Sequence, residues 1–326
     1  MAALHIASVT TKLPLVAGRD QHWYILRSRN SSLGRAAPNV EKGIKVARRR
    51  KLKLDEIGYW SEIKLDIIRE YAKAYSTILA AQEKPRFHHV YIDAFAGAGV
   101  HLSKTTGTEV EGSPIIAANT QPPFREYHFI DLDGVKVGNL RSIFGQRQDI
   151  HIHQGDCNDV LLRDVLPHVR WDDYRRGLCL LDPYGLHLNW EVIQTAGHLK
   201  TIDLFLNFPI MDMNMNVFWH NPEGVHETDI CRMNSFWGDE SWRNIAYEPV
   251  RTLFETEDKK TDNETVAAAF RERLRKVAGF SNVPQPLPMR NTKGAVVYYL
   301  FFGSPKPVAQ NIVTDIFNKY RNRGEV

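Results

Sequence analysis

Four acidic residues stand where short apolar runs end: Asp93, Asp131, Asp156 and Asp182. Each follows a segment whose composition predicts a buried parallel strand. In an open parallel sheet, the carboxyl ends of the strands converge on one crevice in which ligands bind. We therefore interpret the four carboxylates as parts of one shared site. The alternative is four independent turn residues, since aspartate is common in turns.

The stretch after Asp93 contains two glycines, Gly97 and Gly99. Glycine lets the backbone turn sharply and approach a ligand closely, because it has no Cβ. Asp93 and this turn would face the charged amino-acid part of a nucleoside-like cofactor. An ordinary tight turn is the simpler interpretation of Gly-x-Gly taken alone. A dinucleotide enzyme is disfavoured, because Leu102 stands where its third glycine is expected.

Two of the other strand-end acids suit a nucleoside. Asp131 would accept hydrogen bonds from ribose hydroxyls, and a carboxylate forms strong, charge-assisted bonds of this kind. Asp156 would reach the amino edge of an adenine ring. We expect Asp133 to cap the helix that follows, although an exchange of roles between Asp131 and Asp133 stays open.

The four residues Asp182-Pro183-Tyr184-Gly185 could act on an exocyclic amine of a base. Such an amine is a poor nucleophile, because its lone pair is delocalised into the ring. Asp182 and the carbonyl of Pro183 could accept its two N–H groups, and the fixed φ of proline helps to direct that carbonyl outward. Tyr184 could stack on the base. The alternative is a plain turn, since most of these residues favour turns.

The rest of the chain predicts the elements that would position these residues. Apolar residues spaced three and four apart from Trp60 to Leu79 indicate a helix with Ser61 as its N-cap. A polar loop is expected to about Glu111, and Ser113 would cap the next helix. Strands and helices then alternate, which implies a parallel sheet with right-handed crossovers. The expected strands are 90–92, 127–130, 150–153, 177–181 and 202–206, and the expected helices are 115–119, 135–144, one ending at 166, 190–198 and 307–320.

Two further segments complete the predicted domain. Residues 211–282 break the alternation, and we interpret them as a helical insertion whose last helix has a capping box beginning at Thr261. The segments 287–290 and 295–302 predict a hairpin. The expected fold is therefore α/β and Rossmann-like, with a seven-stranded, mostly parallel sheet, one antiparallel strand, a C-terminal β-hairpin and a helical insertion.

Length, composition and cysteine usage limit the class of protein. The 326 residues can form one large domain or two. No apolar run approaches the roughly 20 residues that a membrane span needs, and the N-terminus lacks the apolar core of a secretory signal. The three cysteines lie far apart without a Cys-x-x-Cys, so we expect neither a metal site nor a disulfide framework. We expect a reduced, cytoplasmic protein.

Residues 1–53 carry a strong positive charge. They hold 12 Lys and Arg residues against only Asp20 and Glu41, and the densest cluster is Arg48-Arg49-Arg50-Lys51. Such an arm could contact the phosphates of a nucleic acid. A disordered basic extension, outside a domain that covers 54–326, is the simpler interpretation. An acid-poor, arginine-rich leader also resembles an organellar transit peptide.

These residues resemble those of class I S-adenosylmethionine-dependent methyltransferases. The segment 93–99 resembles their cofactor loop, Asp131 their ribose acid and Asp156 their adenine-side acid. The segment 182–185 is similar to the Asp-Pro-Pro-Tyr motif of enzymes that methylate amino groups of bases. It lacks the second proline and is closer to the Asp-Pro-Phe/Tyr-Gly of tRNA guanine-N2 methyltransferases. The resemblance implies S-adenosyl-L-methionine bound at Asp93, Phe95, Gly97, Gly99, Ser113, Asp131, Asp156 and Cys157, and catalysis at Asp182, Pro183, Tyr184 and Gly185.

Over about residues 56–320 the sequence also resembles the bacterial three-Cys-motif partner protein family, at segments such as 112–114, 155–158 and 206–209. The cysteines of that name belong to a neighbouring protein. The resemblance implies a methyltransferase-like fold without an assigned reaction, and a partner protein that carries the motif. We expect methyl transfer from S-adenosylmethionine to an amino group, on a base of RNA or DNA. The alternative is a partner or binding subunit of this fold without turnover of its own.

Overall fold

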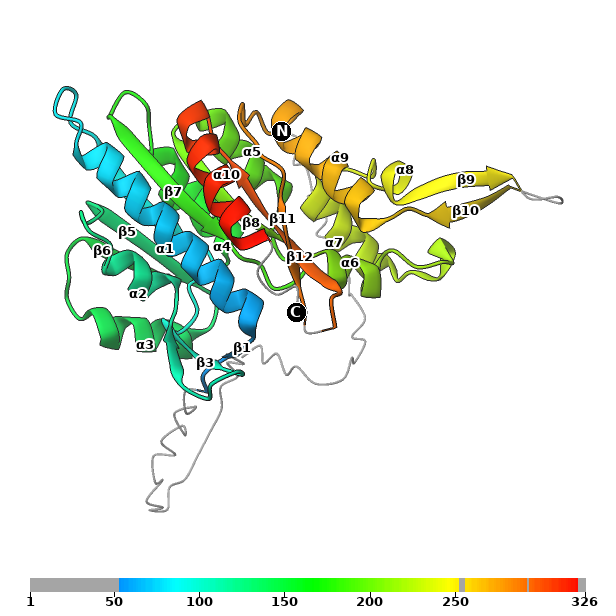
Figure 1. The fold of residues 1–326 in the computed structure, drawn as a ribbon, viewed down its shortest axis with the longest axis horizontal. Helices are drawn as coiled ribbons and strands as arrows, with labels where there is room; N and C mark the ends of the chain where they lie inside the picture. The colour runs from blue at the N-terminus through cyan, green and yellow to red at the C-terminus, as the bar shows by residue number, and fades with distance from the viewer. Residues whose placement is uncertain (1–52, 252–255, 292, 322–326) are drawn as a thin grey trace, which may run out of the picture. The chain divides into compact units, whose positions relative to one another are not determined.

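A seven-stranded sheet forms the centre of the fold (Figure 1). Its strand order is β11-β12-β8-β7-β2-β5-β6. Five strands are parallel to one another: β2 (His88–Asp93), β5 (Glu126–Asp131), β6 (Ile150–Gln154), β7 (Arg175–Leu181) and β8 (Ile202–Phe208). The antiparallel strand is β12 (Val296–Gly303), which pairs with β8 and with β11 (Leu287–Arg290). The predicted Rossmann-like sheet with one antiparallel strand and a C-terminal hairpin is confirmed.

The computed structural model describes residues 53–251, 256–291 and 293–321, and the structural statements below refer to these residues. They belong to one compact unit. The expectations for the basic arm fall on residues 1–52, outside the described residues.

The register places the carboxyl ends of the central strands at one level. Asp93 of β2 pairs with Leu180 of β7 on one side and with Phe129 of β5 on the other. Leu181 of β7 in turn pairs with Leu206 of β8. Because parallel strands in register end together, the residues after β2, β5, β7 and β8 share one edge of the sheet.

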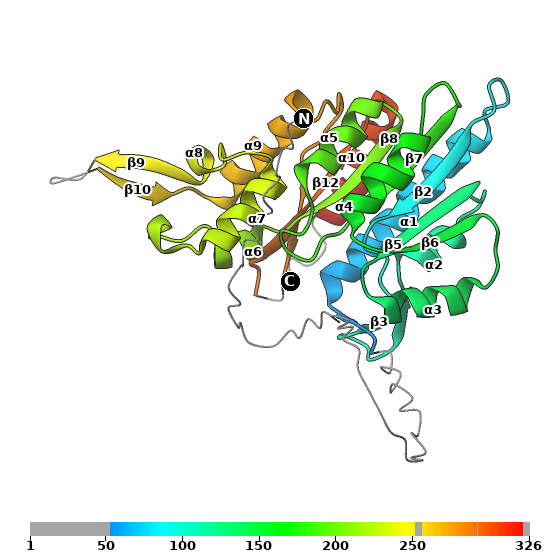
Figure 2. The ribbon, with the colours of Figure 1, turned by 180° about the vertical axis from the view of Figure 1, so that it is seen from behind.

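Helices cover both faces of the sheet (Figures 1 and 2). Apolar side chains of four helices join the core on one face: α1 (Tyr59–Ala80), α2 (Ser113–Ala118), α3 (Gly134–Phe144) and α10 (Pro307–Arg321). The other face is covered by α4 (Cys157–Val160), by the π-helical and 3₁₀ turns Leu161–Val165 and Leu166–His168, and by α5 (Trp190–Leu199). Three layers of this kind bury both faces of the parallel strands, which explains their nearly continuous apolar sequences.

The segment predicted as a helical insertion holds helices and also a hairpin. Its helices are α6 (Ile210–Asn216), α7 (Glu227–Trp237), α8 (Arg243–Ala246) and α9 (Asn263–Lys276), with a 3₁₀ turn at Pro222–Gly224. β9 (Tyr247–Arg251) and β10 (Thr256–Lys260) form an antiparallel hairpin that projects from α8 and α9 (Figure 1). The sequence does not predict this hairpin, because Thr-Glu-Asp-Lys-Lys lacks the apolar alternation of a half-buried strand.

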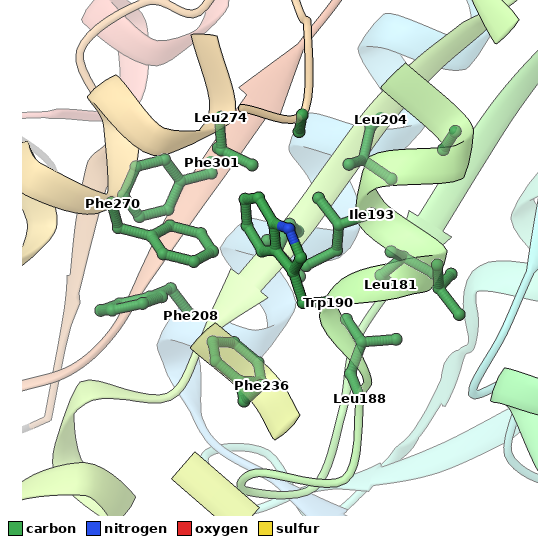
Figure 3. Packing of buried hydrophobic residues seen from close by; sticks show 14 of the residues in the cluster. Leu181, Leu188, Trp190, Ile193, Leu204, Phe208, Phe236, Phe270, Leu274 and Phe301 are labelled. Atoms are coloured by element: carbon green, nitrogen blue, oxygen red, sulfur yellow. The ribbon is translucent and has the colours of Figure 1, made fainter. Parts of the chain in front are cut away.

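Aromatic packing joins the insertion to the sheet (Figure 3). Phe270 of α9 is fully buried, with its ring centroid 4.5 Å from that of Phe208 and 5.4 Å from that of Phe301. The ring of Trp190, in α5, packs edge to face against the Phe270 ring, with 5.9 Å between the two ring centroids. Truncating a buried phenylalanine typically costs about 3–5 kcal/mol. The insertion is thus packed into the main core through these aromatic side chains.

Three helix starts differ from the sequence expectation. The N-caps are Gly58 instead of Ser61, Gly112 instead of Ser113, and Asp262 instead of Thr261. Asp262 accepts a hydrogen bond from the backbone N–H of Thr265 at 2.6 Å, as a capping carboxylate should. In each case the predicted and the observed N-cap lie one to three residues apart, and both are residue types that commonly cap helices. The sequence alone could not distinguish them.

The predicted polar loop after Gly99 is a small sheet. β3 (Val100–Ser103) and β4 (Glu109–Glu111) form an antiparallel hairpin, and β1 (Glu56–Ile57) pairs with β3 in parallel. The backbone N–H of Leu102 donates to the carbonyl of Asp55 at 3.0 Å. This pairing fixes the segment before α1 beside the Gly97 turn. No strand was predicted for either segment from the sequence.

Candidate active site

A pocket of about 240 Å3 opens at the carboxyl ends of β2, β7 and β8. It brings together the Gly97 turn, the Asp182 motif and the first turns of α1. The residues that line it include Asp55, Lys64, Gly97, His101, Ser113, Asp182, Pro183, Tyr184, Asn207 and Tyr298. The glycine turn after β2 and the Asp182 motif after β7 were predicted as separate motifs, and in the folded chain both line this one pocket.

Asp131 links the turn after β2 to the turn after β5. Its Oδ2 accepts a hydrogen bond from the backbone N–H of Gly97 at 2.9 Å, and its Oδ1 accepts one from Asp133 at 2.8 Å. Gly97 and Gly99 have φ values of +65° and +85°, in the left-handed region where a side chain is strained. Each carboxylate oxygen has two acceptor sites, so Asp131 retains capacity for further donors.

Asp93 lies behind this turn, without exposed surface. Its Oδ1 accepts a long, 3.4 Å hydrogen bond from the backbone N–H of Phe95, while its Oδ2 is buried without a hydrogen-bond partner among the described residues. Burial raises the pKa of Asp93 to about 7; the nearby Ser113 opposes the shift, and the nearby Asp182 adds to it. A direct contact between Asp93 and a ligand therefore requires the turn to move.

The acids of the next two strands sit at helix starts. Asp133 is the N-cap of α3 and accepts from the backbone N–H of Val135 at 2.8 Å, which confirms its predicted role as a cap. Asp156 is the N-cap of α4, and its Oδ1 accepts from the backbone and side-chain nitrogens of Asn158 at 2.8 and 2.9 Å. Cys157 is buried, and burial raises the pKa of its thiol to about 12. The Cys157 side chain is therefore a neutral thiol at pH 7.

Asp182 forms an ion pair with Lys64 of α1 inside the pocket. The Lys64 side chain is 10 % exposed and that of Asp182 is 27 % exposed. Burial opposes the charge of Lys64, but attraction to Asp182 outweighs it and raises the pKa of the lysine above its usual value. The ammonium also lies 5.4 Å from the centroid of the Tyr298 ring.

Sequence reasoning missed Lys64, although a signal existed. Lys64 stands in the first half of α1 among Ile63, Leu65 and Ile67, all of them buried. A lysine on the buried stripe of an amphipathic helix needs a partner, because a lone charge is costly to bury. The sequence could therefore have indicated that an acid of the sheet faces this helix.

Tyr184 extends from the same motif to the surface. Its side chain is 67 % exposed, and its hydroxyl donates to Oδ2 of Asp55 at 3.3 Å. Lys136 of α3 donates to the same oxygen at 2.6 Å and lies 5.4 Å from the centroid of the Tyr184 ring. Asp55 thus connects the segment before α1, the helix after β5 and the motif after β7 across the mouth of the pocket.

The end of the motif is fitted against the insertion. Pro183 is buried, and Gly185 has φ +60°. A Cβ on Gly185 would come within 2.8 Å of Oδ2 of Asp212, in α6. Asp212 pairs with Arg232 of α7 at 3.6 Å. The glycine is therefore required both by its backbone conformation and by this close approach.

Two further side chains present unpaired polar atoms at the pocket. Oδ1 of Asn207, at the end of β8, and Nδ1 of His101, in β3, are buried and have no hydrogen-bond partner within the described part of the chain. Burial lowers the pKa of His101, so the ring is neutral at pH 7. Buried polar atoms are normally satisfied, and these two are placed to bind a polar ligand. Asn207 falls in the segment 206–209 of the family resemblance but was given no role there, and His101 was not singled out by the sequence.

No group of three or more His, Cys, Asp or Glu side chains in the described part of the chain could hold a metal ion. Among the helices that the structure describes, none combines the length and apolar character needed to cross a membrane.

Comparisons with known proteins identify no family. No protein-family model and no curated protein matches the sequence. Among solved structures, protein LPL1258 from Legionella pneumophila is 11 % identical, with a TM-score of 0.45 over 80 % of this chain and 93 % of its own. A Thermobifida fusca protein proposed to be a methyltransferase is 12 % identical, with a TM-score of 0.37 over 75 % and 79 %. M. jannaschii TYW2, solved in complex with AdoMet, is 11 % identical, with a TM-score of 0.30 over 75 % of each chain.

With these TM-scores below 0.5, the fold assignment rests on the strand order and register of this chain itself.

Proposed function

We propose that this chain is an S-adenosylmethionine-dependent methyltransferase that acts on an amino group of a nucleic-acid base. The observation that carries the proposal is that Asp182, Pro183 and Tyr184 line the same pocket as Gly97, on the carboxyl edge of the sheet. This edge is where open α/β sheets bind ligands.

The residues present suit this cofactor. Asp131 is fixed by two backbone N–H groups and has acceptor capacity left for ribose hydroxyls. Leu132, next to it, is 57 % exposed and offers an apolar surface to a flat ring. The hydrogen bonds of Asp156 go to Oδ1, so Oδ2 can accept from an adenine amino group. Gly97 lines the pocket without a side chain that would keep a ligand away.

When bound, S-adenosylmethionine supplies an electrophilic methyl group on its sulfonium. Asp182 uses Oδ2 to bind Lys64, which leaves Oδ1 to accept an N–H of the acceptor amine. The unpaired Oδ1 of Asn207 is a second acceptor for that amine. The nitrogen gains the methyl group and releases one proton, which the 27 % exposed carboxylate of Asp182 can pass to solvent. Much of the rate would come from holding the two reactants in line.

A planar base is the acceptor that these side chains suit best. Tyr184 presents an exposed ring directly beside Asp182, and base–aromatic stacking contributes about 1–3 kcal/mol. The cation of Lys136 lies over the same ring and would favour a phosphate nearby. Both features belong to the motif or touch it, so one bound nucleotide could contact all of them.

The competing candidate is a cofactor-binding partner subunit without turnover, for instance one that assembles with a protein carrying a three-Cys motif. The observation in its favour is the ion pair itself, since Lys64 already takes up part of the hydrogen-bonding capacity of Asp182. In that case the pair is a structural contact, and the pocket holds a ligand that does not react.

The test has two stages. Isothermal titration with S-adenosylmethionine measures binding, and tritiated methyl transfer onto total tRNA, rRNA and DNA then measures turnover. Binding with label on one nucleic-acid fraction supports the enzyme. Binding without transfer to any fraction, with or without added partner protein, supports the partner subunit. No heat of binding and no thermal shift would reject both, because a ligand specific to the native state must stabilise it.

A further inference from the structure

A second pocket, of about 360 Å3, lies at the opposite edge of the sheet. Its walls come from the second half of α1, the start of α10 and the amino ends of β7 and β8. The apolar side chains that enclose it are Tyr71, Tyr75, Ile78, Leu79, Val308 and Ile312. It shares no lining residue with the candidate active site. Its size lies within the range of small-molecule sites.

Arg176, at the start of β7, lines this pocket, and its positive charge is buried. It is only 9 % exposed, yet it forms no ion pair with any described residue. Its guanidinium donates a hydrogen bond to the neighbouring carbonyl of Arg175 at 2.7 Å. Burial lowers the pKa of Arg176. A buried arginine without an acid is costly, and a bound anion would remove that cost.

Aromatic rings fix the guanidinium of Arg176 in position. Its Cζ lies 3.9 Å from the ring centroid of Trp171 and 4.7 Å from that of Phe87. Lys306 lies 5.0 Å from the same Trp171 ring. Trp171 is itself 48 % exposed, so this group of charges and rings stands at the mouth of the pocket.

The one carboxylate of the pocket wall is already satisfied. Asp203 accepts hydrogen bonds from the hydroxyls of Tyr71, at 2.6 Å, and Ser304. Burial raises the pKa of Asp203 to about 6, and both hydrogen bonds oppose that shift. Lys200 also lines the pocket and donates to the carbonyl of Gly279. Cations therefore outnumber carboxylates around an otherwise apolar space.

We propose that this pocket binds a small amphipathic monoanion, with its apolar body between α1 and α10 and its anionic group on Arg176. The chemical class is a carboxylate on an aliphatic chain or on an aromatic ring. An apolar wall with one well-placed charged group is the usual composition of a small-ligand site. Arginine suits a carboxylate because its N–H groups match the two oxygens.

A matched pair of fluorescent probes tests the proposal on the full chain. The anionic probe is 1-anilinonaphthalene-8-sulfonate, and the neutral probe is N-phenyl-1-naphthylamine, which has the same rings without the sulfonate. We expect one bound anionic probe per chain. The variant Arg176→Gln should weaken its binding at least tenfold and change the affinity of the neutral probe less than twofold. The control Arg141→Gln, an exposed arginine on α3, should bind both probes as the wild type does.

A second variant keeps the proposal testable if Arg176→Gln fails to fold. Val308 is 54 % exposed at the pocket, so Val308→Asp should preserve the fold and repel the anionic probe. Decanoate and indole-3-acetate, used as competitors, distinguish an aliphatic from an aromatic ligand, and decanol should compete less well than decanoate.

Three results would overturn the proposal. The first is an unchanged affinity for the anionic probe in both variants. The second is an equal loss of both probes in Arg176→Gln, which would make the arginine a packing residue only. The third is displacement of the anionic probe by S-adenosylmethionine, which would place the probe in the other pocket.

Discussion

Lys64 of α1 and Asp182, which follows β7, meet in an ion pair inside the candidate active site, 118 positions apart in the sequence. The pair joins the first helix of the domain to the motif on which the proposed chemistry depends. It therefore has two separable effects, one on stability and one on the proposed reaction.

The first prediction concerns stability. Lys64→Met leaves Asp182 in a largely buried position without its counter-charge. Breaking a fully buried pair costs about 3–5 kcal/mol, and the partial exposure of Asp182 should reduce the loss to about 2 kcal/mol. Urea unfolding measures the change. The double variant Lys64→Met/Asp182→Leu should recover part of the loss, because neither charge is then buried alone. A double variant less stable than both single variants would contradict this explanation.

The second prediction compares two neighbouring acids. Asp131→Ala should weaken S-adenosylmethionine binding by about 1.5–3 kcal/mol, the range for hydrogen bonds to a charged group. Asp133→Ala removes the N-cap of α3 and should cost about 1 kcal/mol of stability, with little change in cofactor affinity. Calorimetric titration and urea unfolding of both variants provide the two readouts. Equal affinities in the two variants would remove Asp131 from the cofactor site.

The third prediction concerns catalysis. Asp182→Asn should lower kcat by at least tenfold with little change in cofactor affinity, because the carboxylate acts on the acceptor amine. The substitution is nearly isosteric, but it also removes the counter-charge of Lys64, so urea unfolding of the same variant must show that it is folded under the assay conditions. Methyl transfer must first be assigned to one nucleic-acid fraction. Transfer at the wild-type rate would reduce the motif to a turn and favour the partner subunit.

The fourth prediction separates the exposed ring from the carboxylate. Tyr184→Ala should raise KM for the nucleic acid by about 5- to 150-fold, since stacking on one base contributes about 1–3 kcal/mol. Tyr184→Phe should behave as the wild type, because the ring remains and only the hydrogen bond to Asp55 is lost. If Tyr184→Phe is as impaired as Tyr184→Ala, the hydroxyl and its contact with Asp55 matter and stacking does not.

The fifth prediction follows from the raised pKa of Asp93, about 7 against 3.8 in an unfolded chain. Between these pH values the native state keeps a proton that the unfolded state has released. Its contribution to stability is therefore complete below about pH 4 and declines as the pH rises to about 7, by up to about 4 kcal/mol. Asp93→Asn should abolish this part of the decline.

The measurement for Asp93 is a difference between two proteins. Asp203, with a pKa of about 6, and His89 and His153, each near 4, also titrate, but they do so in both proteins. The stability of wild type minus that of Asp93→Asn should fall across pH 4–7. A flat difference would show that the Asp93 carboxyl is not held neutral.

Local sequence was sufficient for the order of the strands along the chain and for where most of them end. Apolar runs followed by an acid indicated β2, β5 and β7, because a strand buried on both faces must be apolar and its exit to water polar. Asp133 was also predictable as a cap, since the N–H groups it serves are two residues away. The motif 182–185 could also be recognised from the sequence, because its four residues are adjacent and mostly favour turns.

The tertiary structure decided what depends on partners far apart in the chain. Nothing near Lys64 in the sequence indicates Asp182, and nothing near Asp55 indicates Lys136 or Tyr184. The strand β1 exists because β3 offers it hydrogen bonds, and the β9–β10 hairpin has no apolar pattern to announce it. Arg176 was one basic residue among many until the fold buried it between Trp171 and Phe87. Burial and ion pairing arise only when the chain packs. They determine that Lys64 is paired with Asp182 in one pocket and that Arg176 is buried in the other.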